Sequence, residues 1–242
     1  MSESFFFVLE GMDGSGKSEI SRRLAAGWRA QIGERVLLTF QPHDDSVAGK
    51  YIRSILSREW EVISPTLALA FALNRLDHIQ RVITPFLEGG DQQVAICDRY
   101  VLSSLVYQTV APLEISDVML INSAARVPDL TIYLDASAET CYERMGARGT
   151  SRELFEGKLN ETRDAYLRGI AYLRGRGEQV IIVDANGDRL SVINGILAAL
   201  RGVAPAWLPT DPVDVLPPIP PITNIAPAMR VFEQHFVDPQ RR

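Results

Sequence analysis

The amino-acid sequence predicts an α/β fold, namely a doubly wound, five-stranded parallel sheet with helices on both faces. Short apolar runs alternate with stretches of helical periodicity along most of the chain. Strands that are buried on both faces and separated by helices form parallel sheets, in which ligands bind beyond the carboxyl ends of the strands. The expected strands are 5–9, 35–40, 93–97, 130–134 and 179–183. The expected helices are 18–31, 65–88, 114–126, 154–174 and 188–201.

The length and composition are those of a globular protein with one α/β domain and an appendage. The chain has 242 residues, of which 46% are hydrophobic and 23% charged, and both fractions are ordinary. Its net charge of -5 provides no basic surface for binding nucleic acid. The apolar runs are too short for a signal peptide or a membrane span, and Cys97 and Cys141 have neither zinc-ligand nor disulfide-framework spacing. We therefore expect a cytoplasmic protein that binds neither nucleic acid nor a membrane.

The composition changes after Gly202. We expect one domain over residues 1–202 and a proline-rich extension over 203–242, which holds nine of the 14 prolines. Such a segment forms neither a helix nor a central strand, because proline lacks the backbone N–H. Apolar residues are interleaved with the prolines, so we expect the extension to lie along the core or against a neighbouring subunit. The stretch 226–236 could form a short terminal helix.

The strongest motif follows the first expected strand. Residues 11–18 read Gly-Met-Asp-Gly-Ser-Gly-Lys-Ser and fit the P-loop pattern G-x-x-x-x-G-K-S, whereas a glycine-rich turn that binds nothing would not need a strand before it and a helix after it. The glycines let backbone N–H groups point at a phosphate, and the helix N-terminus adds positive potential. Lys17 would reach the β- and γ-phosphates, and Ser18 would hold Mg²⁺. The expected ATP-binding residues of this P-loop NTPase fold are Gly11, Met12, Asp13, Gly14, Ser15, Gly16, Lys17 and Ser18.

A second motif ends the third expected strand. Asp98 follows a buried apolar run, where it would join Ser18 as a ligand of Mg²⁺ or of its waters. Arg99 next to it could clamp a phosphate with its planar guanidinium. If a helix begins near residue 102, Ser104 and Gln108 share one face of it. The alternative is a salt bridge at the end of a strand, followed by an ordinary polar helix.

These motifs together resemble the thymidylate kinase family. The resemblance is carried by Asp98-Arg99-Tyr100-x-x-Ser103-Ser104-x-x-Tyr107-Gln108, by the helical segment 69–78 and by the strand segment 128–135. It covers about residues 5–201 and leaves the proline-rich extension unmatched. It implies ATP-dependent, Mg²⁺-assisted phosphorylation of a deoxynucleoside monophosphate, with dTMP as the first candidate. It also implies a homodimer, with the apolar helix 65–88 as the expected contact.

The resemblance implies an acceptor site as well. Phe71 would stack on a pyrimidine ring, Arg75 would donate to a base carbonyl, and Arg99 would hold the 5′-phosphate of the acceptor. Phe71 and Arg75 are four residues apart and so share a helix face, although Phe71 could also be an ordinary core residue. Asp13 is similar to a family residue near the sugar 3′-hydroxyl and the acceptor phosphate. The implied acceptor-binding residues are Phe71, Arg75, Arg99, Ser104, Tyr107 and Gln108.

Arginines at 144, 148 and 152 form a row with a spacing of four, which predicts that they lie along one helix face. By resemblance, residues 144–156 are a lid that closes over ATP. Arg144 would then contact ATP, and Arg148 or Arg152 would reach the transferring phosphoryl group. A solvated basic face, paired with neighbouring glutamates, is the alternative. The expected catalytic residues are Asp13, Lys17, Arg99, Arg148 and Arg152.

One loop departs from the family pattern. Where the family usually carries Arg-Glu-Pro-Gly-Gly, this chain has Phe40-Gln41-Pro42-His43-Asp44-Asp45. An acceptor phosphate is largely ionised at pH 7, because its second pKa is about 6, and needs no general base. A deoxynucleoside kinase, the second hypothesis, must deprotonate a hydroxyl and would require a carboxylate where this chain has Gln41. A third hypothesis is a nucleotide-binding regulator that has lost turnover.

Overall fold

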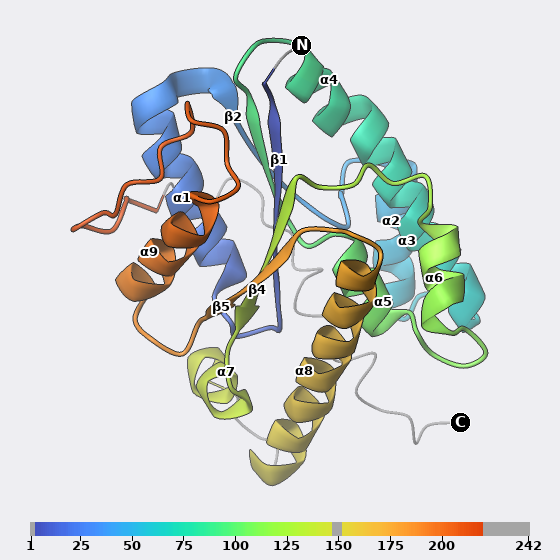
Figure 1. Ribbon diagram of the computed structural model, residues 1–242. Coiled ribbons are helices and arrows are strands. Elements are labelled where there is room, and N and C mark those ends of the chain that lie inside the picture. The colour runs from blue at the N-terminus through green and yellow to red at the C-terminus, as the bar shows by residue number, and fades with distance from the viewer. Residues whose placement is uncertain (1–2, 147–151, 220–242) are drawn as a thin grey trace.

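A single parallel sheet of five strands forms the centre of the protein, in the order β2-β3-β1-β4-β5 (Figure 1). The computed structural model describes residues 3–146 and 152–219, and the side chains among these except at 152–156. The strands are β1 (Phe5–Gly11), β2 (Val36–Phe40), β3 (Val94–Asp98), β4 (Leu130–Asp135) and β5 (Val180–Asp184). Each strand lies within two residues of its expected range, so the predicted α/β fold is confirmed.

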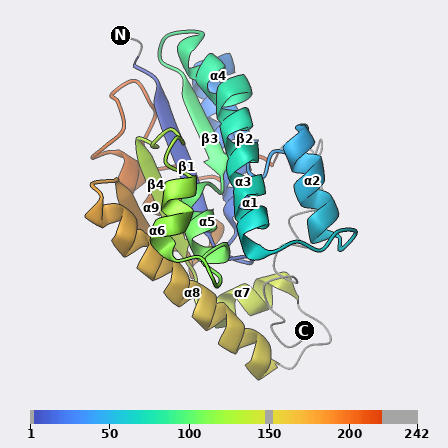
Figure 2. The ribbon, with the colours of Figure 1, turned by 90° about the vertical axis from the view of Figure 1, so that its right-hand side faces the viewer.

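Helices cover both faces of the sheet, as expected. One face is covered by α1 (Lys17–Ile32) and α9 (Arg189–Leu200) (Figure 1). The opposite face carries α3 (Ser64–His78), α4 (Thr84–Glu88), α5 (Val101–Tyr107) and α8 (Arg152–Gly175). The remaining helices are α2 (Val47–Leu56), which lies beside α3 in Figure 2, α6 (Ile115–Ile121) and α7 (Ala138–Met145). Within the two described ranges, no helix is both long enough and apolar enough to cross a membrane.

The expected helix 65–88 consists of three parts. After α3, a π-helical turn covers Ile79–Ile83, and α4 begins at Thr84. Pro85 lacks the N–H that would bond the preceding turn, and its ring pushes that turn's carbonyl away, so the helix widens locally. The periodicity did not predict α2, which starts after Ser46, whose hydroxyl caps the helix by accepting from the Gly49 N–H at 2.8 Å.

The central strand β1 positions the P-loop. All seven of its residues are buried. Successive side chains point to opposite faces, so Phe6 packs edge-on against Tyr100, and Phe7 packs against Trp28 of α1. The strand runs between β3 and β4, and the P-loop therefore leaves the sheet at its middle, where parallel sheets bind their ligands.

The described part of the proline-rich extension, residues 203–219, packs on the core and is here called the C-terminal strap. It runs beside α1 and α9 (Figure 1). The indole N–H of Trp28 donates to the Pro209 carbonyl oxygen at 2.9 Å, and Leu208 is 3% exposed. For the strap, the expectation of packing along the core is confirmed, whereas the helix expected at 226–236 lies outside the described residues.

Candidate active site

The P-loop joins β1 to α1, which begins at Lys17. The ammonium group of Lys17 donates to the Met12 carbonyl oxygen at 2.9 Å and lies 3.4 Å from Asp13 Oδ1. At Gly14 the φ angle is +82°, and a Cβ there would lie 2.5 Å from the Cys141 carbonyl oxygen of α7. Only glycine fits such an approach. The loop is therefore packed closely against α7.

Two oxygen-bearing side chains meet beside the P-loop and fit a magnesium ion. Ser18 Oγ donates to Asp98 Oδ2 at 2.6 Å. The second carboxylate oxygen, Asp98 Oδ1, is buried and accepts no hydrogen bond from the described residues. Mg²⁺ prefers hard oxygen ligands and usually takes one or two from protein, with the rest from water and substrate phosphates. The Ser18 hydroxyl and the Asp98 carboxylate could supply these protein ligands.

Arg99 lies between the P-loop and the helix α5. Its backbone has a φ angle of +69°, which is uncommon for a residue other than glycine, and its N–H donates to the Leu9 carbonyl oxygen at 3.0 Å. Its buried guanidinium donates to the Asp13 carboxylate and to Ser103 Oγ at 3.3 Å. Burial lowers the pKa of Arg99, but Asp13, together with Tyr166, Tyr107 and Asp98, raises it by more, so the net pKa lies well above its ordinary range. Arg99 is therefore a permanent cation.

Glu10 is a functional residue that the sequence reasoning missed. It is 0% exposed in the middle of the sheet. Its carboxylate accepts from the N–H groups of Tyr100 and Ser103, at 2.7 and 3.0 Å, and from the Ser103 hydroxyl at 2.6 Å. A carboxylate at a helix N-terminus is stabilising, and here it holds the turn that carries Arg99. The only signal in the sequence is a charged residue at the end of an apolar run.

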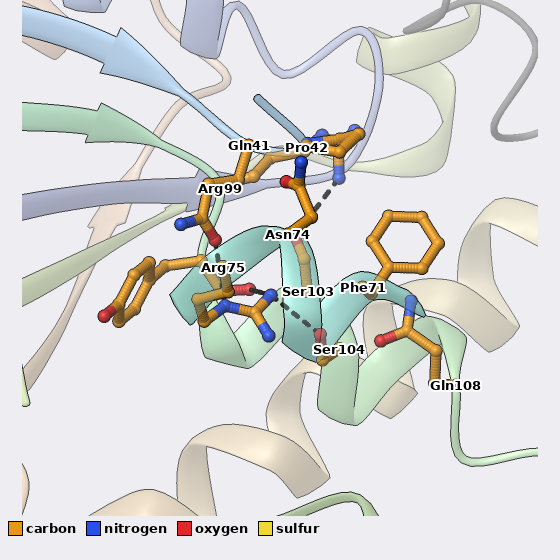
Figure 3. Close-up of a pocket in the computed structure, with 10 residues that line it drawn as sticks. Gln41, Pro42, Phe71, Asn74, Arg75, Arg99, Ser103, Ser104 and Gln108 are labelled. Atoms are coloured by element: carbon orange, nitrogen blue, oxygen red, sulfur yellow. Dashed lines mark hydrogen bonds between the residues drawn. The ribbon is translucent and has the colours of Figure 1, made fainter. Parts of the chain in front are cut away.

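A pocket lies beside Arg99 and gathers most of the predicted acceptor residues (Figure 3). It is lined by Gln41, Pro42, Phe71, Asn74, Arg75, Arg99, Tyr100, Ser103, Ser104 and Gln108. In Figure 3, Phe71 and Gln108 lie side by side at one end. Gln108 Oε1 is buried without a hydrogen-bond partner among the described residues, so it is available to a ligand. Tyr107 does not line the pocket, and its ring instead lies 5.5 Å from the guanidinium carbon of Arg99.

Arg75 is a buried cation surrounded by neutral acceptors. It donates to Gln41 Oε1 and to Ser104 Oγ, both at 2.8 Å, to the Tyr100 carbonyl oxygen at 3.0 Å, and to the Asn122 side-chain oxygen. Burial lowers its pKa, yet an arginine stays charged in proteins. Glu10 opposes this effect and raises the pKa of Arg75, and the side chain itself lines the pocket, where its charge faces a ligand.

Gln41, at the position where this chain departs from the family pattern, orients Arg75. Its amide nitrogen lies 3.2 Å from His78 Nδ1, and His78 Nε2 lies 2.7 Å from Thr39 Oγ1. Burial first, then the charges of His43 and Arg75, lower the pKa of His78 to about 3, so its ring is neutral. Since Gln41 Oε1 already accepts from Arg75, its amide donates to Nδ1, which places the ring proton on Nε2, facing Thr39. The Gln41 amide thus both accepts from Arg75 and donates to His78.

The rest of that loop is held by α3 and α2. The side chain of Asn74 accepts from the His43 N–H at 2.7 Å and donates to the His43 carbonyl oxygen at 2.8 Å. Asp44 forms a salt bridge with Arg53 at 2.7 Å. One of the two carboxylates of this loop is therefore paired with an arginine, which weakens its repulsion of an acceptor phosphate.

The prediction that Arg144, Arg148 and Arg152 lie along one helix face is wrong. α7 ends at Met145, because Gly146 turns the chain into the left-handed conformation, and Arg152 begins a separate helix, α8. Arg144 donates to the carbonyl oxygens of Ala185 and Gly187, both at 2.8 Å, in the loop after β5. Arg148 lies outside the described residues, as does the side chain of Arg152.

The parallel sheet, the P-loop at its middle and the pocket beside Arg99 together define the class of protein, a P-loop phosphotransferase. Residues 9–196 match the family model described as thymidylate kinase, and the chain belongs to that family. The resemblance stated from the motifs is thus confirmed over almost the same range.

Individual relatives agree with this assignment. The chain is 41% identical over 202 residues to a probable thymidylate kinase of Pyrococcus abyssi, which covers 81% of this chain and 96% of that protein. It is 31% identical over 210 residues to a thymidylate kinase of Mesomycoplasma hyopneumoniae, which covers 84% of this chain and 99% of that protein. A solved structure of thymidylate kinase from Ehrlichia chaffeensis has the same fold, with a TM-score of 0.59, 24% identity and coverage of 80% and 98%.

Proposed function

We propose that the protein carries out the reaction of its family, transfer of the γ-phosphoryl group of ATP to dTMP to give ADP and dTDP, with the residue roles given below. The observation that carries this proposal is the place of Arg99, which lines the acceptor pocket and also contacts Asp13 of the P-loop. A phosphate held by Arg99 would face a nucleotide on the P-loop. Catalysis then consists of alignment and charge compensation.

On the donor side, the P-loop N–H groups and the start of α1 would hold the phosphates, and Lys17 would move from Asp13 to the β- and γ-phosphates. Ser18 and Asp98 would hold Mg²⁺, which supplies charge neutralisation on the phosphates. Arg144 lies beside the loop after β5, where the nucleoside part of ATP would pass. To reach the phosphates, Lys17 would also give up its hydrogen bond to the Met12 carbonyl oxygen.

On the acceptor side, the pocket has the chemistry of a pyrimidine site. Phe71 offers a ring to stack on, and the free oxygen of Gln108 can accept from the base N–H. Arg75 provides positive charge for a base carbonyl. Asp13 would lie near the sugar 3′-hydroxyl and the acceptor phosphate. Ser104 would complete the wall beside Arg75, and Tyr107 would support Arg99 from outside the pocket.

The lining of the pocket favours a monophosphate over a nucleoside as the acceptor. None of the described residues that line it is an aspartate or a glutamate, and Gln41 is an amide bonded to Arg75 and His78. A nucleoside hydroxyl would find no carboxylate base in this lining, and the nearby Asp13 is paired with Arg99 and Lys17, whereas an ionised phosphate needs no base. A regulator without turnover would not need Lys17, Asp98 and Arg99 at one edge of the sheet.

Two further parts of the proposal concern the lid and the assembly. Arg148 and Arg152 would close over ATP and reach the transferring phosphoryl group, as their resemblance to the family lid implies. We also propose a cytoplasmic homodimer. Its support is a set of exposed apolar side chains on neighbouring helices, Val47 of α2, Leu69 and Leu73 of α3 and Leu120 of α6, which are 86%, 57%, 61% and 73% exposed.

The proposal is tested by ADP formation from ATP and Mg²⁺, with dTMP, other pyrimidine deoxynucleotides and thymidine as separate acceptors. We expect turnover with dTMP and none with thymidine. Turnover with thymidine alone would instead indicate a nucleoside kinase. Tight ATP binding without turnover of any acceptor would indicate the regulator.

A further inference from the structure

Tyr166 of α8 contacts both nucleotide sites, although none of the roles above uses it. Its side chain is 0% exposed. Its hydroxyl donates to the Gly11 carbonyl oxygen of the P-loop at 3.0 Å and accepts from Arg99 Nη1 at 3.2 Å. One hydroxyl from a helix late in the chain thus joins the donor loop to the acceptor arginine.

The aromatic surroundings hold this hydroxyl in place. The Tyr133 ring stacks on the Tyr166 ring with centroids 4.9 Å apart, and the Tyr107 ring meets it edge-on at 6.1 Å. Burial first, and then Tyr107, raise the pKa of Tyr166 well above its usual range. The hydroxyl therefore keeps its proton, which points at Gly11, and turns a lone pair to Arg99.

Arg99 depends on such neighbours for its orientation. Its backbone has a φ angle of +69°, an uncommon conformation for a residue other than glycine, which persists only where surrounding contacts maintain it. Asp13 and Ser103 accept from two edges of the guanidinium, and Tyr166 accepts from the same Nη1 as Ser103. Of these partners, Tyr166 alone also bonds a P-loop backbone carbonyl. Removing its hydroxyl would take away the bond that ties the guanidinium to the P-loop backbone and leave the rotatable Asp13 side chain to hold it to the P-loop.

We propose that Tyr166 is a positioning residue for the acceptor phosphate: by bonding Arg99 and Gly11, its hydroxyl fixes the guanidinium relative to the P-loop. This inference rests on the proposed role of Arg99 in holding the 5′-phosphate of dTMP. An arginine that must be ordered on binding holds phosphate more weakly, because the ordering costs entropy. Binding of the nucleoside part, which does not involve Arg99, is unaffected.

The test compares dTMP with thymidine, which lacks the phosphate, in calorimetric binding to the full-length protein. In Tyr166→Phe, the Kd of dTMP rises about five- to tenfold, while that of thymidine changes less than about twofold. The matched control is Tyr133→Phe, which removes a buried hydroxyl from the same ring stack. That hydroxyl has no hydrogen-bond partner among the described residues, so both Kd values stay within about twofold.

A double-mutant cycle with Arg99→Gln shows whether Tyr166 acts through Arg99. Without the guanidinium, Tyr166→Phe has no further effect on dTMP binding. The inference is overturned if Tyr166→Phe weakens dTMP and thymidine equally, changes neither, or keeps its full effect beside Arg99→Gln. If Arg99→Gln alone leaves dTMP binding unchanged, the proposed role of Arg99 fails and the inference falls with it. If Arg99→Gln weakens dTMP binding and Tyr166→Phe does not, the inference alone fails.

Discussion

The acceptor pocket and the C-terminal strap are both held by hydrogen bonds, but the two networks differ in kind. In the pocket, buried side chains bond one another, as where Arg75 donates to Gln41 at 2.8 Å. In the strap, side chains of the core helices bond backbone carbonyls, as where Trp28 donates to Pro209 at 2.9 Å. The pocket therefore fixes the positions of charged groups, whereas the strap fixes the path of a chain segment.

The proline content of the strap explains this difference. Proline has no N–H, so the strap mainly accepts, for example from Arg23 at the Pro217 carbonyl oxygen, 2.7 Å away. Val213 is not a proline, and its N–H and carbonyl both bond the Asn194 side chain of α9, at 2.9 and 3.0 Å. Changes in the pocket should therefore alter stability and chemistry together, while changes in the strap should alter stability alone.

The largest effect is expected at Glu10. Glu10→Ala leaves two buried N–H groups of the α5 turn without an acceptor, and it lowers the free energy of unfolding by about 3 kcal/mol. It also weakens dTMP binding, because the turn carries Arg99. Urea denaturation and calorimetry measure the two effects. The control is Glu34→Ala at an exposed position, which stays within about 0.5 kcal/mol of wild type; an equally small effect at Glu10 would refute the account.

A smaller effect on stability is expected when the pH is lowered, because of His78. Its pKa of about 3 in the folded protein lies below the unfolded value of 6.5, so the unfolded chain binds the extra proton between these values. Stability therefore falls as the pH drops below 6.5, by about 2 kcal/mol at pH 5 from this residue. Urea denaturation at pH 7.5 and pH 5 measures the loss. His78→Gln removes that part of the pH dependence, and an unchanged dependence would show that His78 does not titrate as described.

The smallest effect is expected in the strap. Trp28→Phe keeps most of the ring and removes the indole N–H that donates to Pro209. It lowers the free energy of unfolding by about 1 kcal/mol and leaves kcat/KM for dTMP unchanged. A change in kcat/KM as large as the change in stability would show that the strap is coupled to the site, and would contradict the contrast drawn above.

Local patterns predicted much of this molecule. Apolar runs located all five strands, and the P-loop pattern located Lys17, Ser18 and the turn glycines. The motif after β3 located Arg99, Ser104 and Gln108, and the family resemblance added Phe71 and Arg75; these five are among the residues that line the pocket. In each case the signal lies within a few residues of the feature that it predicts.

Features that depend on contacts between distant segments could not be predicted. Gln41 and His78 come from β2 and α3, and nothing local indicates that they bond each other. The local sequence indicates only that Glu10 belongs to a strand, and its bond to the Tyr100 N–H at the start of α5 depends on the tertiary fold. The arginine row failed for another reason, because a spacing of four was given more weight than Gly146, which ends α7. The P-loop and the acceptor motif are each formed by neighbouring residues in the sequence, whereas the side chains that hold them in place come from distant segments.

The central claim is that phosphoryl transfer occurs between the P-loop and the acceptor pocket. It is tested most directly by following the γ-phosphate of radiolabelled ATP into dTDP with wild type, Lys17→Ala and the exposed-site control Lys50→Ala. We predict labelled dTDP with wild type and Lys50→Ala, and a rate about 10³-fold lower with Lys17→Ala at unchanged melting temperature. Equal labelling of dTDP by Lys17→Ala and wild type would contradict the account.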